Sequence, residues 1–359
     1  MNRVKNNDTI SIAKAVGIIL VVIGHSGCPD ILSKFIYLFH MPLFFIASGF
    51  FFKEENLVEW RKFVVRRIKG IWYPFEKWGL SFLWLHNVLF LIGLHSHYYE
   101  LKTIVINTIT CMTLMIGTDY LTSGVWFLRD LFLGSIILLF VSKIFYSWMK
   151  ISFRMSMTIS CFILLVLYVI FDQLNICINF KWIIFLEKRT LYSTSFIAIG
   201  LIFKTLINNI SRQSIKRASW GVILCFTIEI FATYNFPKID INVSSEWLWA
   251  GILLAMVGFI MVLRFSQLLK KTILSKELVW IGNNSIIIFF LHTICYKPIS
   301  LVIIKIYNLP FSNLIERVII KDNWWIIYSL SGIVLPVIVY KLWLKYITPI
   351  INVDKLLWK

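Results

Sequence analysis

Long apolar runs separated by short polar segments repeat along the whole chain. A helix that crosses a bilayer needs about 20 mainly apolar residues, and ten runs come close to that length. They cover residues 10–28, 35–52, 72–94, 126–146, 154–172, 191–208, 219–236, 247–266, 279–303 and 324–346. The pattern predicts an all-α, polytopic bundle of about ten transmembrane helices. The segment 103–117 is apolar but short, which indicates an interfacial or re-entrant helix.

The composition favours a lipid environment. Of the 359 residues, 59% are hydrophobic and only 15% are charged, whereas soluble domains average about 25% charged residues. Acyl chains rather than a water-excluding core would therefore cover much of the apolar surface. No stretch long enough for a separate soluble domain remains between the runs, so we expect residues 1–359 to form one transmembrane domain.

The excess of basic residues indicates the orientation of the helices. The formal net charge is +18, and the lysines and arginines fall in short loops between the apolar runs. With the N-terminus in the cytoplasm, 25 of the 36 basic residues lie on the cytoplasmic side, as the positive-inside tendency requires. We expect an N-in, C-in topology and contact with anionic lipid headgroups. Nucleic-acid binding is disfavoured because no compact basic face remains outside the lipid.

The cysteines are scattered and lie mostly inside apolar runs. They are Cys28, Cys111, Cys161, Cys177, Cys225 and Cys295. None forms a Cys-x-x-Cys or Cys/His spacing, so the sequence predicts neither a disulfide framework nor a metal site.

The first run carries two ionisable side chains, Lys14 and His25. Eleven helical residues make about three full turns, so both side chains share one helix face, about 16 Å apart along the axis. A snorkelling lysine and an interfacial histidine would explain them structurally. Ionisable groups inside a span also mark functional sites, and both interpretations stay open.

The second run, "FHMPLFFIASGFFF", begins near His40. Pro42 fits the first turn of a helix, and the small pair Ser48–Gly49 allows another backbone to approach closely. Helix packing around a hydrogen-bonded histidine is the structural alternative to a functional role for His40.

A basic amphipathic segment, "RKFVVRRIKGIWYPF", follows at residues 61–75. Arg66, Arg67 and Lys69 belong to it, and Arg66 and Lys69 share a face because they are three residues apart. Such a cluster binds either lipid headgroups or the phosphates of a cytosolic nucleotide-bearing donor.

Two acidic residues lie in or beside predicted spans. Asp130 follows Arg129 at the start of the fourth span, where a local ion pair at the interface is the structural explanation. Glu229 lies in the middle of the seventh span. A carboxylate within a membrane helix is a candidate for an intramembrane polar site.

The ninth run, "WIGNNSIIIFFLHTICYKP", combines amides, a serine and a histidine. Asn284 and Ser285 are residue types that cap helix N-termini, so we expect them to cap this span. His292 lies seven residues after Ser285 and is expected to reach the bundle interior.

Five stretches in order resemble the membrane-bound acyltransferase family 3, the O-acyltransferases of bacterial surface polysaccharides. They are "DTISIAKAVGIILVVIGH", "HMPLFFIASGFFF", "RRIKGIWYPF", "VWFLRDLF" and "IGNNSIIIFFLH". The resemblance covers nearly the whole chain. This sequence has Lys14 and Lys69 where the family usually has arginine; lysine keeps the charge but loses the bidentate fork.

The resemblance implies a membrane enzyme that transfers an acetyl or similar acyl group. The donor would be cytosolic acetyl-CoA or another acyl-CoA, and the acceptor a hydroxyl of a surface or secreted carbohydrate. The location would be the bacterial cytoplasmic membrane, and no metal is implied.

The resemblance also implies roles for individual residues. His25 would be the catalytic base or would carry the acyl group covalently. His40 and Asp130 are weaker candidates that would orient His25 or bind sugar hydroxyls. Lys14 is expected to bind the donor or to be structural.

The basic segment completes the implied donor site. Arg66, Arg67 and Lys69 would hold the phosphates of acyl-CoA, while Glu229 and His292 remain candidates for an intramembrane polar site.

Two other function classes fit ten helices with a few buried polar groups. A transporter or exporter of a glycan or small molecule is one, although the paired broken helices and internal symmetry common in transporters are not visible in the sequence. A membrane sensor or scaffold without catalytic activity is the other. It predicts that the charged residues of the first three spans can be replaced without loss of function.

Overall fold

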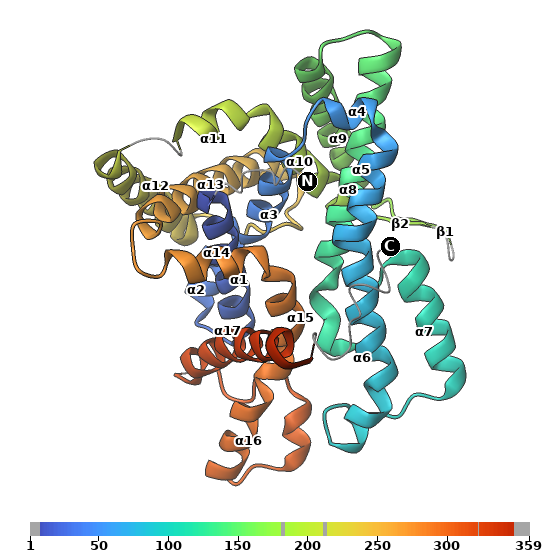
Figure 1. Cartoon of the computed structure of the whole chain (residues 1–359), viewed down its shortest axis with the longest axis vertical. Helices are drawn as coiled ribbons and strands as arrows, with labels where there is room; N and C mark the ends of the chain where they lie inside the picture. The colour runs from blue at the N-terminus through green and yellow to red at the C-terminus, as the bar shows by residue number, and fades with distance from the viewer. Residues whose placement is uncertain (1–7, 181–183, 211–213, 322, 348–359) are drawn as a thin grey trace.

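The computed structural model describes residues 8–180, 184–210, 214–321 and 323–347, and these are almost entirely helical (Figure 1). The first half contains α1 (Asp8–His25), α2 (Asp30–Tyr37), α3 (His40–Phe50), α4 (Glu55–Val58), α5 (Trp60–Arg67), α6 (Tyr73–Leu91), α7 (Leu101–Leu114), α8 (Trp126–Lys143) and α9 (Phe153–Gln173). The second half contains α10 (Lys188–Ile202), α11 (Lys204–Ile210), α12 (Ile215–Asn235), α13 (Leu248–Leu269), α14 (Ser275–Asn283), α15 (Ser285–Cys295), α16 (Lys297–Ile306) and α17 (Trp324–Leu342).

Short irregular elements connect these helices. The π-helical turns are η1 (Ile68–Trp72), η3 (Ile144–Trp148) and η6 (Trp343–Ile347), and the 3₁₀ turns are η2 (Tyr120–Val125), η4 (Ser245–Trp247) and η5 (Phe311–Ile315). Strands β1 (Ile178–Phe180) and β2 (Ile184–Leu186) pair antiparallel in a small hairpin.

The prediction of an all-α, multi-pass membrane protein is confirmed. Seven helical segments of the described chain are long and apolar enough to cross a membrane, and the pair α10–α11, bent by 62°, would make an eighth. The seven segments are Asp8–His25, Asp30–Phe50, Trp126–Trp148, Phe153–Gln173, Ser245–Leu269, Ser285–Ile306 and Trp324–Tyr346.

Helices α6 and α12 cover the predicted spans 72–94 and 219–236 but are not among these seven. The number of about ten spans and the N-in, C-in orientation therefore stay predictions, as does the single domain. Some basic residues used for the orientation lie outside the described residues: Arg3, Lys5, Lys181, Arg212, Lys355 and Lys359.

Several predicted spans are interrupted. The second is two helices, α2 and α3, and the ninth passes through α14, α15 and α16. The segment around 103–117 forms α7, a separate apolar helix of 14 residues. These breaks place polar residues inside the bundle instead of at its ends.

Small residues let the central helices approach closely. A Cβ on Gly49 of α3 would lie 1.9 Å from the carbonyl oxygen of Ile197 in α10, and one on Gly200 would lie 2.1 Å from the oxygen of Ile46. A Cβ on Gly282 would lie 1.7 Å from the oxygen of Ser11, where α14 crosses α1. The close backbone approach predicted at Ser48–Gly49 is confirmed. These contacts hold α3 against α10 and α1 against α14.

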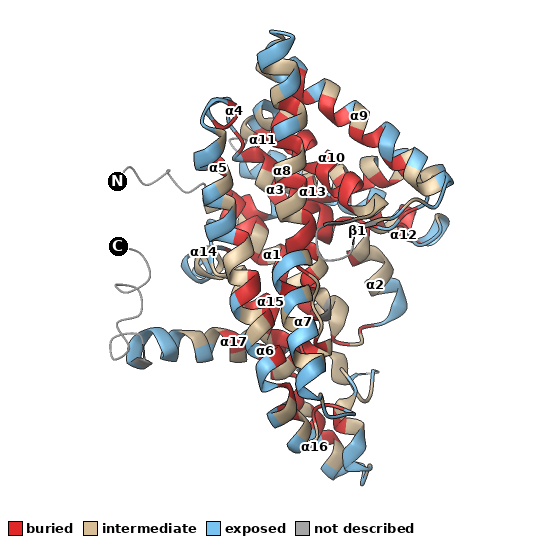
Figure 2. Ribbon diagram, turned by 90° about the vertical axis from the view of Figure 1, so that its right-hand side faces the viewer, coloured by how far each residue is buried: buried red, intermediate tan, exposed pale blue. Residues whose placement is uncertain are grey.

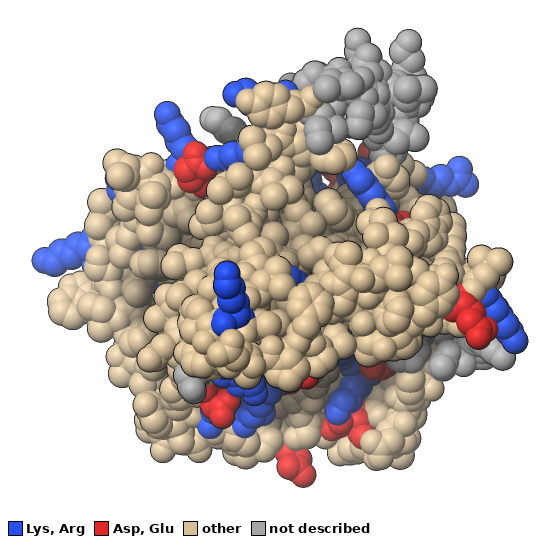
Figure 3. Space-filling model, turned by 90° about the horizontal axis from the view of Figure 1, so that it is seen from below, with Lys and Arg blue, Asp and Glu red and all other residues tan. Residues whose placement is uncertain are grey.

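The buried residues gather on these central helices (Figure 2). Large apolar side chains such as Trp84, Trp220 and Leu253 point outward and are more than half exposed. An exposed apolar surface of this extent suits contact with lipid. On the face seen from below, charged side chains are scattered rather than gathered in one patch (Figure 3).

Candidate active site

One face of α1 lines two adjoining cavities. Lys14, Ile18 and Val21 line the first, which we call the Lys14 cavity, with a volume of about 240 Å³. Val21 and His25 line the second, the His25 cavity, of about 160 Å³. The predicted common face of Lys14 and His25 is confirmed, and the cavities follow that face from one residue to the other.

The two cavities meet at three side chains that line both. These are Val21, Met41 and Phe289, contributed by α1, α3 and α15. The walls of the Lys14 cavity are mainly apolar, with Phe44 and Phe127 among them. The His25 cavity is more polar, because Arg189, Asp240 and Asn242 line it together with the aromatic rings of Tyr37 and Trp126.

His25 forms a side-chain hydrogen bond with His292. The Nδ1 atom of His25 and the Nε2 atom of His292 are 3.0 Å apart, and the two rings stack with their centroids 5.2 Å apart. The residues are 267 positions apart in the sequence. The expectation that His292 reaches the bundle interior is confirmed, because its side chain is 3% exposed.

A main-chain acceptor fixes which nitrogen of His292 carries the proton, and His292 in turn fixes the proton on His25. His292 Nδ1 lies 2.6 Å from the carbonyl oxygen of Phe289 and must donate to it, since a carbonyl only accepts. In a neutral ring, Nε2 of His292 then accepts, so Nδ1 of His25 donates and Nε2 of His25 keeps its lone pair. The arrangement leaves a basic nitrogen available on His25.

A break in the ninth span positions His292. Helix α14 ends at Asn283 and α15 begins at Ser285, so the chain changes direction before the histidine. The prediction that Asn284 caps this helix with its side chain is wrong: Asn284 donates back to the carbonyl of Trp280, 2.8 Å away, and closes the end of α14 instead. Asn283 accepts from Ser11 of α1 at 2.9 Å, which ties the break to the helix that carries His25.

His40 lines the His25 cavity and is 2% exposed. It begins α3, and its Nδ1 lies 2.9 Å from the carbonyl oxygen of Ile36, to which it donates. Its ring makes an edge contact with Tyr37, with centroids 4.7 Å apart. His40 therefore has Nε2 available toward the cavity, while the hydrogen-bond partner of His25 is His292.

Asp130 lies in a buried ion network and does not line the His25 cavity. Its carboxylate accepts from Arg189 Nε at 2.9 Å, from Thr190 Oγ1 at 2.9 Å and from Arg129 at 3.3 Å. Arg189 is also paired with Glu187, and its guanidinium lies over the Trp126 ring, 4.2 Å from the centroid. The geometry gives Asp130 the role of holding Arg189 at the cavity wall.

The basic segment forms a third cavity, the Arg66 cavity, of about 610 Å³. Its charged and amide-bearing lining residues are Lys53, Glu55, Asn56, Arg66, Arg67, Lys204 and Asn208, so four cations face one carboxylate. It shares Ser48, Phe51 and Arg67 with the Lys14 cavity. Three cavities that share wall residues therefore lie in sequence from the basic segment, past Lys14, to His25.

The two predicted arginines line the Arg66 cavity, whereas Lys69 is exposed and lines neither this cavity nor the Lys14 cavity. Arg66 donates to Asn56 Oδ1 at 2.6 Å. Burial, followed by the charge of Arg66, lowers the pKa of Arg67 to about 10, so Arg67 stays cationic at neutral pH. Lys69 falls in the π-helical turn η1. The wider winding of a π-helix changes the three-residue spacing that would put Lys69 on the same face as Arg66 in an α-helix.

Arg317 is a residue that the sequence analysis missed. It lines a small cavity together with His25, His292 and Thr122. The buried Lys297 holds this loop in place, because its ammonium donates to the carbonyl oxygens of Leu314 and Glu316, each 2.8 Å away. The only sequence signal was a lysine inside an apolar run, which normally requires a specific partner.

Glu229 is fully buried on α12 and lines none of the three cavities. The structure does not bring it together with the other predicted site residues.

Comparison with known proteins identifies the family of the chain. No curated protein and no solved structure matched the chain. Residues 7–343, nearly the whole chain, match the profile of an acyltransferase domain. The chain therefore belongs to the membrane-bound acyltransferase family 3 and is an acyltransferase that transfers groups other than aminoacyl groups.

Proposed function

We propose that the protein transfers an acetyl or similar acyl group from cytosolic acyl-CoA to a hydroxyl of a surface or secreted carbohydrate, in a bacterial cytoplasmic membrane. The observation that carries the proposal is the set of three cavities that share wall residues, the last of which is lined by His25. In this proposal a thioester approaches the imidazole from the Lys14 cavity and a hydroxyl approaches it within the His25 cavity.

The Arg66 cavity suits the nucleotide end of acyl-CoA. Its four cationic side chains can pair with phosphate oxygens, and guanidinium groups bind phosphates bidentately. The Lys14 cavity has a smaller volume and is mainly apolar, which suits the extended arm that carries the thioester. Lys14 lies on this route about 16 Å below His25, so its proposed role is to hold the donor.

The His25 cavity suits a carbohydrate. Asp240 and Asn242 offer acceptors and donors to hydroxyl groups, and Trp126 offers an aromatic face. Arg189, held by Asp130, adds a fixed donor at the same wall. His40 is proposed to bind the acceptor rather than to orient His25.

His25 acts as the general base in this proposal. Its Nε2 takes the proton of the acceptor hydroxyl while the oxygen attacks the thioester carbonyl carbon. The intermediate collapses with cleavage of the carbon–sulfur bond, and the CoA sulfur leaves and takes up the proton. Arg317, beside His25, stabilises the negative charge that develops on the carbonyl oxygen.

A direct test compares the surface glycans of cells with and without this protein, together with vesicles given [¹⁴C]acetyl-CoA. We expect a mass increase of acetyl units on the glycan and transfer of label into the glycan fraction. A glycan of unchanged mass and vesicles without labelled glycan would contradict the proposal. Label that remains on the protein, and is released when acceptor is added, would instead indicate that His25 carries the acyl group covalently.

A further inference from the structure

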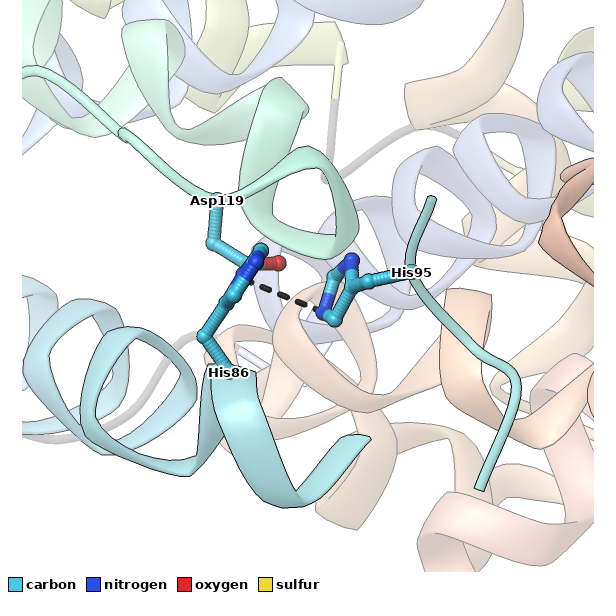
Figure 4. A group of neighbouring side chains, drawn as sticks. All are labelled: His86, His95 and Asp119. Carbon is cyan, nitrogen blue, oxygen red and sulfur yellow. Dashed lines mark hydrogen bonds and ion pairs between the residues drawn. The ribbon is translucent and has the colours of Figure 1, made fainter. Parts of the chain in front are cut away.

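A second cluster of histidines lies apart from the His25–His292 pair. His86 near the end of α6, His95 in the following loop and Asp119 just before η2 converge on one point (Figure 4). Each offers one ligand atom, and the three atoms lie within 4.8 Å of one another. All three residues are buried, at 2%, 6% and 2% exposed.

Each member of the cluster has its second polar atom oriented away from the common point. His86 Nε2 lies 3.1 Å from the carbonyl oxygen of His97 and must donate to it, which leaves a lone pair on Nδ1 in a neutral ring. That lone pair faces Asp119 Oδ2 at 2.8 Å, although both atoms are then acceptors. Asp119 Oδ1 accepts the N–H of Leu121 at 2.9 Å, so only Oδ2 points into the cluster.

His95 supplies an independent observation. Its Nε2 is buried without a hydrogen-bond partner in the described structure and points toward Asp119 Oδ2, 3.3 Å away. Two neutral imidazole nitrogens and a carboxylate oxygen that face one another repel, and either a bound cation or a proton on one ring removes this repulsion. The nearby ammonium of Lys297 does not serve, because it donates to Tyr120 and to loop carbonyls.

We propose that His86 Nδ1, His95 Nε2 and Asp119 Oδ2 bind a divalent transition-metal ion, with Zn²⁺ as the best match. Two histidines and one carboxylate, with water in the fourth position, form a common zinc coordination set. Ligands about 2 Å from a tetrahedral ion lie about 3.3 Å apart, which is the separation found between His95 and Asp119. Binding requires His86 and Asp119 to separate by about half an ångström. It also requires the rings of His86 and His95, which stack with centroids 4.0 Å apart, to turn so that both nitrogens face the ion.

The hydrogen bond of His86 to the His97 carbonyl supports this assignment. Histidines that bind metals usually donate their other ring nitrogen to a carbonyl or carboxylate, which fixes the ring. The sequence predicted no metal site because its cysteines form no Cys-x-x-Cys or Cys/His spacing. His86 and Asp119 are 33 positions apart and meet only through the fold.

The ion would join α6 and its following loop to the turn beside the proposed active site. The carbonyl of Asp119 accepts from the N–H and the hydroxyl of Thr122, at 3.0 and 2.8 Å. Thr122 and Gly124 in turn line cavities that contain His25. Metal binding is therefore expected to stabilise one wall of the site without supplying a group that reacts.

The test measures metal content on full-length protein purified without a histidine tag. After exposure to Zn²⁺ and removal of free ion, we expect about one zinc per chain, at least tenfold weaker binding in His95→Ala, and a zinc-dependent rise in melting temperature that His95→Ala lacks. His97→Ala is the matched control. His97 is exposed and lies in the same loop, and the substitution keeps the main-chain carbonyl, so the variant should bind zinc normally.

His95→Ala removes a buried ring that stacks on His86, but it removes no hydrogen bond from the ligand nitrogen. The zinc content of the unmodified protein provides a measurement that does not depend on any variant folding. If wild-type protein retains no more zinc than His95→Ala, the cluster is an ion pair between a protonated His86 and Asp119, and the metal site is excluded. None of these measurements depends on acyl transfer.

Discussion

At the scale of single residues, the site depends on how main-chain carbonyls orient imidazole rings. His292 donates to Phe289 and accepts from His25, so the lone pair of His25 Nε2 is available. The sequence was sufficient to place Lys14 and His25 on one helix face, because eleven residues make about three turns, and both residues line the adjoining cavities. It could not identify the His25–His292 bond, which joins residues 267 positions apart.

Replacing the partner of His25 tests this orientation. We expect His292→Phe to lower kcat by about 100-fold, within the range of general-base effects, with little change in the KM for acyl-CoA. His292→Gln should retain more activity, because its amide oxygen can accept from His25 Nδ1. Steady-state kinetics of [¹⁴C]acetyl transfer in vesicles separates kcat from KM. Equal activities in the two variants would show that the ring orientation does not matter.

Arg67 lines both the Arg66 cavity and the Lys14 cavity, so the proposed donor site is tested most directly at this residue. We expect Arg67→Ala to raise the KM for acetyl-CoA by about tenfold, the loss of one good charge-assisted contact. Lys62→Ala is the control, since Lys62 is exposed and pairs only with Glu59 among the described contacts. Similar KM values in both variants would contradict the assignment.

The pH dependence of donor binding follows from the same arginine. Burial lowers the pKa of Arg67, but only to about 10, so its charge is lost only well above neutral pH. We expect the KM for acetyl-CoA to stay constant between about pH 6 and pH 8, as measured in buffered vesicles. A rise of the KM within that range would show that another group controls binding.

At the scale of helices, the apolar runs predicted the elements but not their breaks. Hydropathy reports the length of a run and does not show the break at Leu38–Phe39, where the run stays apolar, or the break at Asn284. The positions of His40 and His292 depend on these breaks. The basic segment was predicted as one helical face, whereas the π-helical turn η1 shifts Lys69 away from the cavity.

The crossing of α3 and α10 is sensitive to added volume, and α3 also lines the Lys14 cavity. Gly49→Ala would place a methyl group 1.9 Å from the oxygen of Ile197, so the helices must separate. We expect a clear drop in melting temperature, corresponding to about 1–3 kcal/mol. Gly70→Ala is the matched control, because no atom lies within 4 Å of an added Cβ there. Thermal unfolding of the purified variants compares them, and equal melting temperatures would contradict the close packing.

At the scale of the whole molecule, orientation connects the cavities to the two compartments. The charge pattern predicts that the N- and C-termini are cytoplasmic, which puts the Arg66 cavity on the side where acyl-CoA is made. Reporter enzymes fused after residue 359 and in the loop of residues 92–100 should report opposite sides. If both report the same side, the path proposed for the donor is wrong.

The account depends most on His25 as the group that joins the two routes. The most direct measurement is the initial rate of [¹⁴C]acetyl transfer from acetyl-CoA to glycan in vesicles that contain equal amounts of wild-type protein or His25→Ala. With membrane insertion and melting temperature unchanged, we predict a rate loss of 100-fold or more, about the lower bound for removal of a general base. A His25→Ala variant that transfers acetyl at the wild-type rate would contradict the account.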